Sequence, residues 1–234
     1  MLVAAAVCPC PPLLVPAVAA GAAHELDAVR AACADALGVL AAARPDRLIV
    51  VGPAEQSGRG PHPQGSTGTF EGFGVDVAVQ LGSGAAGDGR LPVSLSVAAW
   101  LLEQARWAGP VEGLGVGEPL APERCFEVGA ELAVQAERVS LLVMGDGSAC
   151  RTLKAPGYLD ERAEPFDAAV ARALGAADVQ ALKDLDAELA YELKAAGRAP
   201  WQVLAGAAEG AGLSGTLLHD EAPYGVGYLV AAWS

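Results

Sequence analysis

The chain has 234 residues, of which 53% are hydrophobic and 18% charged, a composition that excludes an intrinsically disordered protein. Its 15 lysine and arginine residues stand against 28 aspartate and glutamate residues, so the net charge is −13 at pH 7. No run of basic residues occurs, and nucleic acids and anionic membranes are therefore not expected as partners. No apolar stretch reaches the roughly 18 residues of a membrane-spanning helix.

The cysteines and the first residues bear on the cellular compartment. The five cysteines are an odd number in a chain of this size, which favours reduced thiols. The apolar residues 1–7 have no positive region before them and are followed by three prolines within five residues, unlike a signal peptide. We therefore expect a cytoplasmic protein.

The first fifty residues predict a strand, a helix and a second strand. Leu2–Val7 is a short apolar run stopped by prolines, as in a buried strand. Ala22–Ala43 has apolar residues at helical spacing. Arg47–Val51 is a second apolar run. This order is typical of a right-handed βαβ unit with a parallel sheet.

The next segment has less regular patterning. Ala54–Gly74 is rich in glycine, serine, threonine and proline and lacks any period, so we predict a long loop, which in compact domains is usually functional or mobile. Val75–Gln80 is a candidate strand, and Gly82–Arg90 is a second flexible stretch. Pro92–Ala108 predicts a helix with proline near its first turn.

The second half predicts two more strands and a cluster of helices. The strands Val111–Val116 and Val139–Met144 flank a helix over Pro122–Glu137, and the loop Gly145–Asp160 follows them. The remaining elements are four short helices (166–174, 179–182, 185–195 and 201–211) and two closing strands (217–220 and 226–232). The fold class is therefore α/β, with a mostly parallel sheet between helices, and we expect residues 1–234 to form a single domain.

Several short motifs follow the predicted strands. The first strand runs into Cys8-Pro-Cys-Pro-Pro12, the second into Gly52-Pro-Ala54, and a later one into Gly145-Asp-Gly-Ser-Ala149. Further motifs are Gly157-Tyr-Leu-Asp160, Pro165-Phe-Asp167, Gly197-Arg-Ala-Pro200 and Tyr224-Gly-Val-Gly-Tyr228. In their order and spacing these segments resemble the B subunit of the class III extradiol ring-cleavage dioxygenases, a superfamily that includes the Memo-like proteins. The resemblance spans nearly the whole chain.

The resemblance implies an iron site whose ligands have been replaced. In that family two histidines and a carboxylate hold non-haem iron and leave positions open for catechol and oxygen. The positions of the two histidines are occupied here by Cys10 and Ala54, and a cysteine that contacts metal in Memo-like relatives corresponds to Ala196. Only Asp146 matches directly. Iron is therefore not expected.

The resemblance also implies a missing acid–base group. The family's further histidine, in an Asp-Leu-Ser-His motif, corresponds to Ala149, or to Cys150 if the alignment slips by one residue. None of the three histidines in the chain stands at a ligand position. His24 opens a helix, His62 lies in the long loop, where we expect it to be solvated, and His219 lies near the last strand.

Two interpretations of Cys10 remain open. In the first, Cys10 is a small buried residue that replaced histidine after function was lost. In the second, Cys8 and Cys10, which lie on one side of an extended chain, face a common pocket and join Asp146 in a zinc site, or Cys10 acts as a nucleophile. Asp146 is likewise either a turn residue or a ligand at the carboxyl end of a strand.

Other polar residues are candidates for the same pocket. Glu55 follows the second lost histidine position, and Ser148 lies in the Asp146 loop. Arg151 is placed to lower the pKa of its neighbour Cys150. Arg198 is expected either to hold an anion or to bond backbone carbonyls. With Pro53, these residues predict a pocket at the carboxyl ends of three strands.

Two functional hypotheses follow from these residues. The first is a retired enzyme, or pseudoenzyme, whose cleft binds a small molecule or a protein partner without a cofactor. The second is a repurposed metal- or thiol-dependent enzyme, an oxidoreductase or hydrolase, in which Cys10, Asp146 and Cys150 are catalytic with or without zinc. The first is favoured because both histidine ligands and the acid–base group are lost together. A homo-oligomer is compatible with either hypothesis.

Overall fold

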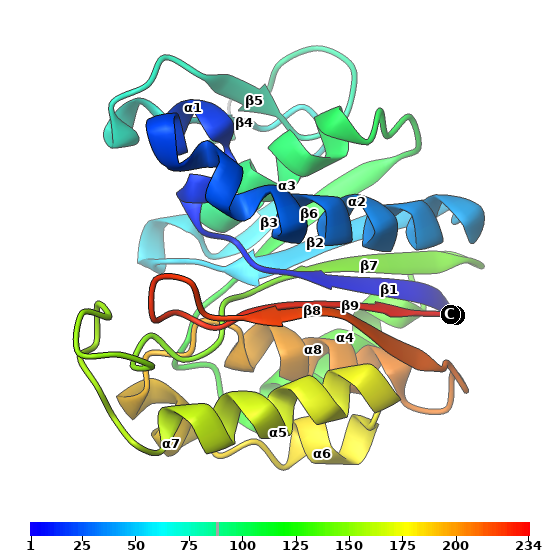
Figure 1. Cartoon of the computed structure of the whole chain (residues 1–234). Helices are drawn as coiled ribbons and strands as arrows, with labels where there is room; N and C mark the ends of the chain where they lie inside the picture. Colours follow the sequence, from blue (N-terminus) through cyan, green and yellow to red (C-terminus); the bar gives the residue numbers. More distant parts are fainter. Residues whose placement is uncertain (88) are drawn as a thin grey trace.

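A large mixed β-sheet forms the centre of the computed structural model, which describes residues 1–87 and 89–234 (Figure 1). Seven strands of the described chain belong to this sheet, and two short ones form a separate hairpin. The strands are β1 (Leu2–Cys8), β2 (Arg47–Pro53), β3 (Gly60–His62), β4 (Thr67–Thr69), β5 (Ala78–Gln80), β6 (Val111–Val116), β7 (Val139–Met144), β8 (Gly215–Glu221) and β9 (Tyr228–Trp233).

The sheet has the order β3-β6-β2-β7-β1-β9-β8. Strands β6, β2, β7 and β1 are parallel, whereas β3, next to β6, and the closing pair β9 and β8 are antiparallel to their neighbours. The mostly parallel sheet and the closing hairpin are thus confirmed. The first two strands belong to one parallel sheet as expected, but they are not neighbours, because β7 pairs with both.

Helices cover both faces of the sheet (Figure 1). The α-helices are α1 (Pro16–Ala19), α2 (Asp27–Ala42), α3 (Val93–Gln104), α4 (Pro122–Ala133), α5 (Ala163–Ala176), α6 (Val179–Lys183), α7 (Ala187–Glu192) and α8 (Arg198–Ala208), and the 3-10 helices are Pro12–Leu14, Ala20–Leu26, Gln56–Gly58 and Glu71–Phe73. Helices α2 and α3 pack on one face, and α4 to α8 pack on the other. The predicted C-terminal helical cluster is confirmed. No helix of the described residues has both the length and the apolar character needed to cross a membrane.

Burial on both faces explains the continuous apolar runs of the central strands. Successive side chains of a strand point to opposite faces. In β1, Ala4 and Ala6 enter the core beneath α2, whereas Ala5 and Val7 enter the core on the other face. All four side chains are fully buried. The strand therefore shows no alternation of apolar and polar residues.

The predicted long loop after β2 is wrong in part. Within Ala54–Gly74 the chain forms a 3-10 turn, the edge strand β3, the strand β4 and a second 3-10 turn. Each strand has only three residues, too few to show a period in the sequence. Gly68 of β4 has no room for a side chain, because a Cβ there would overlap Ser96 of α3. The flexible stretch expected over Gly82–Arg90 includes residue 88, which lies outside the described residues.

A buried carboxylate holds the loop after β7 in place. Asp167 of α5 is only 1% exposed. Its Oδ1 accepts a hydrogen bond from the backbone N–H of Ser148 (2.7 Å), and its Oδ2 accepts one from the Ser148 hydroxyl (2.7 Å). The same Oδ2 lies 3.1 Å from Nη1 of Arg151. Burial nevertheless raises the pKa of Asp167, against the lowering effect of its partners. Asp167 therefore ties residues 148–151 to α5.

Replacing Asp167 by alanine should destabilise the fold. The change leaves the Ser148 hydroxyl buried without a partner and Arg151 without its ion pair, which costs about 3 kcal/mol of unfolding free energy. Urea unfolding followed by circular dichroism measures this loss. The control is Asp76→Ala, since Asp76 is exposed and should change stability by less than about 0.5 kcal/mol. Equal stability of the two variants would show that Asp167 does not hold the loop.

Candidate functional site

The carboxyl ends of the parallel strands bring the sequence-predicted residues to one edge of the sheet. Cys8 of β1 pairs with Met144 of β7, and Pro53 of β2 pairs with Val116 of β6. The segments that follow these four strands therefore leave the sheet side by side. They carry Cys10, Ala54, Glu118 and Asp146. Open parallel sheets bind ligands at this edge.

Asp146 connects three segments of this edge. Its Oδ1 accepts a hydrogen bond from the backbone N–H of Cys10 (2.8 Å). Its backbone carbonyl accepts one from the N–H of Gly197, between α7 and α8 (2.8 Å). Gly145 packs directly on Gly197, and a Cβ at Gly145 would overlap the Gly197 backbone. The carboxylate thus lies where the β1 loop, the β7 loop and the α7–α8 connection meet.

The surroundings of Asp146 favour its protonated form. Burial raises the pKa of Asp146 to about 6, against the opposing effect of the Cys10 N–H. Burial and the nearby Asp146 also raise the pKa of the Tyr228 phenol. The pKa of the Cys10 thiol is raised well above its usual range, first by burial and then by Asp146. This edge of the sheet therefore carries one titratable carboxyl next to two neutral groups.

The cysteines of the described chain are buried free thiols. Cys8 is fully buried beneath α2, where its contact with the Cys33 thiol is the main cause of its raised pKa. Cys150 is also buried, and its Sγ donates to the carbonyl of Leu193 (3.4 Å). These contacts favour the interpretation of the cysteines as packed core residues rather than nucleophiles.

The expected effect of Arg151 on Cys150 is wrong. Burial raises the pKa of the Cys150 thiol, and this effect exceeds the lowering by Lys194 and Arg162. The guanidinium of Arg151 is engaged instead by Asp167 at 3.1 Å. A thiol whose pKa is raised has less of the thiolate form that acts as a nucleophile.

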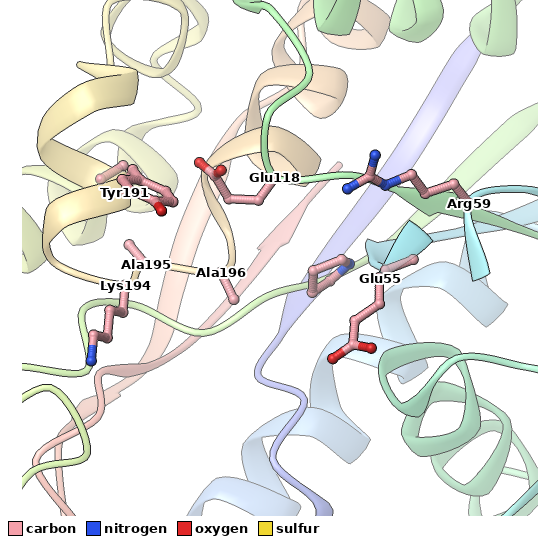
Figure 2. A pocket seen from close by; sticks show the side chains of 10 residues that line it. Glu55, Arg59, Glu118, Tyr191, Lys194, Ala195 and Ala196 are labelled. Atoms are coloured by element: carbon pink, nitrogen blue, oxygen red, sulfur yellow. The ribbon is translucent and has the colours of Figure 1, made fainter. Parts of the chain in front are cut away.

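A cavity of about 410 Å³ lies at the same edge of the sheet (Figure 2). Its walls are Pro53, Ala54, Glu55, Arg59, Glu118, Ala190, Tyr191, Lys194, Ala195 and Ala196. The volume is within the range of small-molecule sites. Four alanines and a proline give the cavity an apolar surface, and charged side chains stand around it. In Figure 2 the guanidinium of Arg59 points toward Glu118, whereas the carboxylate of Glu55 points away from both.

Only part of the expected pocket borders this cavity. The expected wall residues Pro53, Ala54 and Glu55 line it, as does Ala196. Cys10, Asp146 and Cys150 do not, because Cys10 and Cys150 are buried in the two cores on either side of the sheet and Asp146 is engaged by Cys10.

Three other predicted wall residues have structural roles. Ser148 is fully buried and bonded to Asp167. Ala149 holds its loop through backbone hydrogen bonds to Leu193 (2.9 Å) and Gly157 (2.8 Å). Arg198, 2% exposed, donates to the backbone carbonyls of Glu118 and Leu120 and to the Glu118 carboxylate (3.1 Å), so it holds the segment after β6. The second of its two expected roles, bonding to carbonyls, is the one observed.

Four polar or charged residues of the cavity wall were missed in the sequence. Arg59, Glu118, Tyr191 and Lys194 belong to segments without a recognisable motif. Glu118 follows the end of a predicted parallel strand, and this position was the only signal in the sequence that pointed to any of them.

None of the three histidines lines the cavity. His62 was expected to be solvated, but it is buried in β3 and its Nε2 lies 2.9 Å from the carbonyl of Gly58. His24 lies in a 3-10 helix and His219 in β8. Across residues 1–87 and 89–234, no three histidine, cysteine, aspartate or glutamate side chains converge as metal ligands.

Replacing Asp146 by asparagine should change how stability depends on pH. A carboxyl whose pKa rises from 3.8 unfolded to about 6 folded stabilises the fold at low pH, and this contribution is lost as pH rises through that window. Asparagine keeps an oxygen for the Cys10 N–H and does not titrate. Its stability relative to wild type should therefore increase by about 2 kcal/mol between pH 4.5 and pH 8.

Urea unfolding at the two pH values measures the change, with Asp76→Asn as the matched control on an exposed carboxyl. A difference between Asp146→Asn and wild type that stays constant with pH would contradict the raised pKa.

Comparisons with known proteins identify a shared fold. No protein-family model matches the chain. No curated protein matches its sequence. Among solved structures, the chain is similar to the crystal structure of the uncharacterized protein JW3007 from Escherichia coli K12, with a TM-score of 0.59, 16% sequence identity and 99% of each chain covered. At this identity the similarity concerns the fold alone, and it extends over the whole length of both chains.

Proposed function

We propose that this chain is a class III extradiol dioxygenase-like protein that no longer uses iron and retains a cleft for a small molecule. The order and spacing of the motifs after β1, β2 and β7 support this assignment, and so does the position of these motifs at one edge of the sheet. The observation that carries the proposal is the cavity of about 410 Å³ at that edge. Its wall contains Ala54 and Ala196 at two positions where the resemblance implies metal ligands.

The donor set does not fit an iron site. Ala54 and Ala196 offer only methyl groups to the cavity. Asp146 is the one residue of these motifs that matches the family directly, and its Oδ1 already accepts the Cys10 N–H. Iron that activates oxygen needs imidazole and carboxylate ligands together with open positions. The chemistry left to the cleft is recognition by its apolar wall and its charged rim.

The purified protein should neither bind ferrous iron with one-to-one stoichiometry nor cleave protocatechuate. Anaerobic calorimetric titration with ferrous sulfate tests the first point, and the yellow ring-fission product in air tests the second. The measurement uses wild type and Asp146→Asn side by side, so that any iron held by the remaining carboxylate is detected. Tight stoichiometric binding, or product above the no-protein background, would show that other residues have taken over the site.

Filling the cavity should abolish small-molecule binding. A fragment library screened by ligand-observed NMR against wild type should give binders that Ala196→Trp no longer binds, because the indole occupies the space beside Ala54 and Tyr191. Ala42→Trp, at an exposed position of α2, is the matched control and should keep them. Fragments that bind wild type and Ala196→Trp equally would place the binding site elsewhere and refute the proposed cleft.

A further inference from the structure

A second cavity adjoins the first along the same edge of the sheet. It measures about 620 Å³ and shares Pro53, Ala54 and Glu55 with the first cavity. Its remaining walls come from the turn after β2, from residues 69–73 and from the start of α3. These two adjacent cavities, which have Ala54 in the wall of both, are together called the groove.

The second cavity presents apolar side chains to solvent. Phe73 is 43% exposed and Val93 is 44% exposed, and both line this space together with Leu91 and Pro92. Large apolar side chains at this exposure are normal when scattered singly. Here they gather in one hollow, which suits an apolar part of a ligand.

The first cavity contains a cation placed to receive an anion. Among the described residues, Arg59 forms no salt bridge. Its guanidinium lies against Gly117, where any Cβ would overlap Nε and Cζ. Glu118, an acidic residue of the same wall, is bonded to the buried Arg198 at 3.1 Å. Arg59 thus keeps its donors for a ligand, and a guanidinium matches a carboxylate in a two-point hydrogen bond.

Ala54 places a small side chain where the two cavities of the groove meet. Its methyl group belongs to the walls of both cavities. The backbone at this point is held by a hydrogen bond from the Ala54 N–H to the carbonyl of Val116 (2.8 Å). A larger side chain at this position would project into the groove where the cavities meet.

We propose that the groove binds a carboxylate with an apolar chain: the carboxylate at Arg59, the chain across Ala54, and its end against Phe73 and Val93. This inference rests on the proposed small-molecule cleft and defines the chemistry of its ligand. The charge of Arg59 favours a carboxylate as the ligand's head group. The length of the groove favours an extended apolar chain over a single small ring.

Calorimetric titration of the full chain with butyrate, octanoate and dodecanoate tests the inference, below the concentrations at which these acids aggregate. Each methylene that enters the groove should tighten binding about fourfold, so octanoate binds far more tightly than butyrate. The neutral probe 1-octanol should bind at least tenfold more weakly than octanoate, because it cannot pair with Arg59. Equal affinity for butyrate and dodecanoate, or for octanoate and 1-octanol, would overturn the inference.

Variants test the binding of the ligand's carboxylate and of its apolar chain separately. Arg59→Ala should lower the affinity for octanoate at least tenfold and leave the affinity for 1-octanol unchanged. Arg172 is an exposed arginine of α5, and Arg172→Ala should change neither affinity. Ala54→Phe should weaken the binding of dodecanoate more than that of butyrate, because the phenyl ring blocks the way to Phe73 and Val93. Phe73→Ala, at an exposed position, gives an independent measurement and should lower the affinity for dodecanoate alone. Arg90 lines the second cavity, and a loss of octanoate binding in Arg90→Ala rather than in Arg59→Ala would overturn the assigned direction of the ligand.

The outcome also distinguishes this inference from the proposed cleft. If no fatty acid binds wild type, yet other fragments bind it and fail to bind Ala196→Trp, the carboxylate inference is refuted and the cleft stands. If no fragment is sensitive to Ala196→Trp, both are refuted.

Discussion

The parallel pairing of β7 with both β1 and β2 is the interaction on which the site depends. Through it, segments from three distant parts of the sequence leave the sheet at one edge. Asp146 then joins two of these segments by accepting the Cys10 N–H, and its backbone carbonyl receives the α7–α8 connection. The cavity walls come from the β2 and β6 ends and from that same connection. A different strand order would separate these walls.

The fold was largely readable from the sequence because the central strands are buried on both faces. The bounds of β6 and β7 agree with the predicted runs, and the C-terminal helices follow apolar residues at helical spacing. Strand order was not readable, since nothing in the local pattern of β1 or β2 says that β7 enters between them. The three-residue strands β3 and β4 are fixed by pairing with partners elsewhere in the chain, so they too leave no local pattern.

The candidate site was readable only where motifs follow strands. Pro53, Ala54 and Glu55, assigned to a pocket from the sequence, were found in the cavity wall. The cysteines were not, because an alternating pair such as Cys8 and Cys10 points to the same side of an extended chain without showing whether that side is a pocket or a core. Arg59 was not found in this way, because the residue against which its guanidinium lies, Gly117, follows a different strand. Asp167 did carry a signal: it lies on the apolar stripe of its helix with Val170 and Leu174, where a carboxylate needs a buried partner.

The pairing of β1 with β9 joins residues from opposite ends of the sequence, as Ala5 lies opposite Trp233. One side of β1 therefore has no partner until the last strand has been synthesised. During translation the nascent chain exposes this apolar strand edge, which is a template for misassociation with other chains. Such long-range pairing also makes folding slow compared with proteins whose contacts are local. The pairing of β1 is therefore complete only after β9 has emerged from the ribosome.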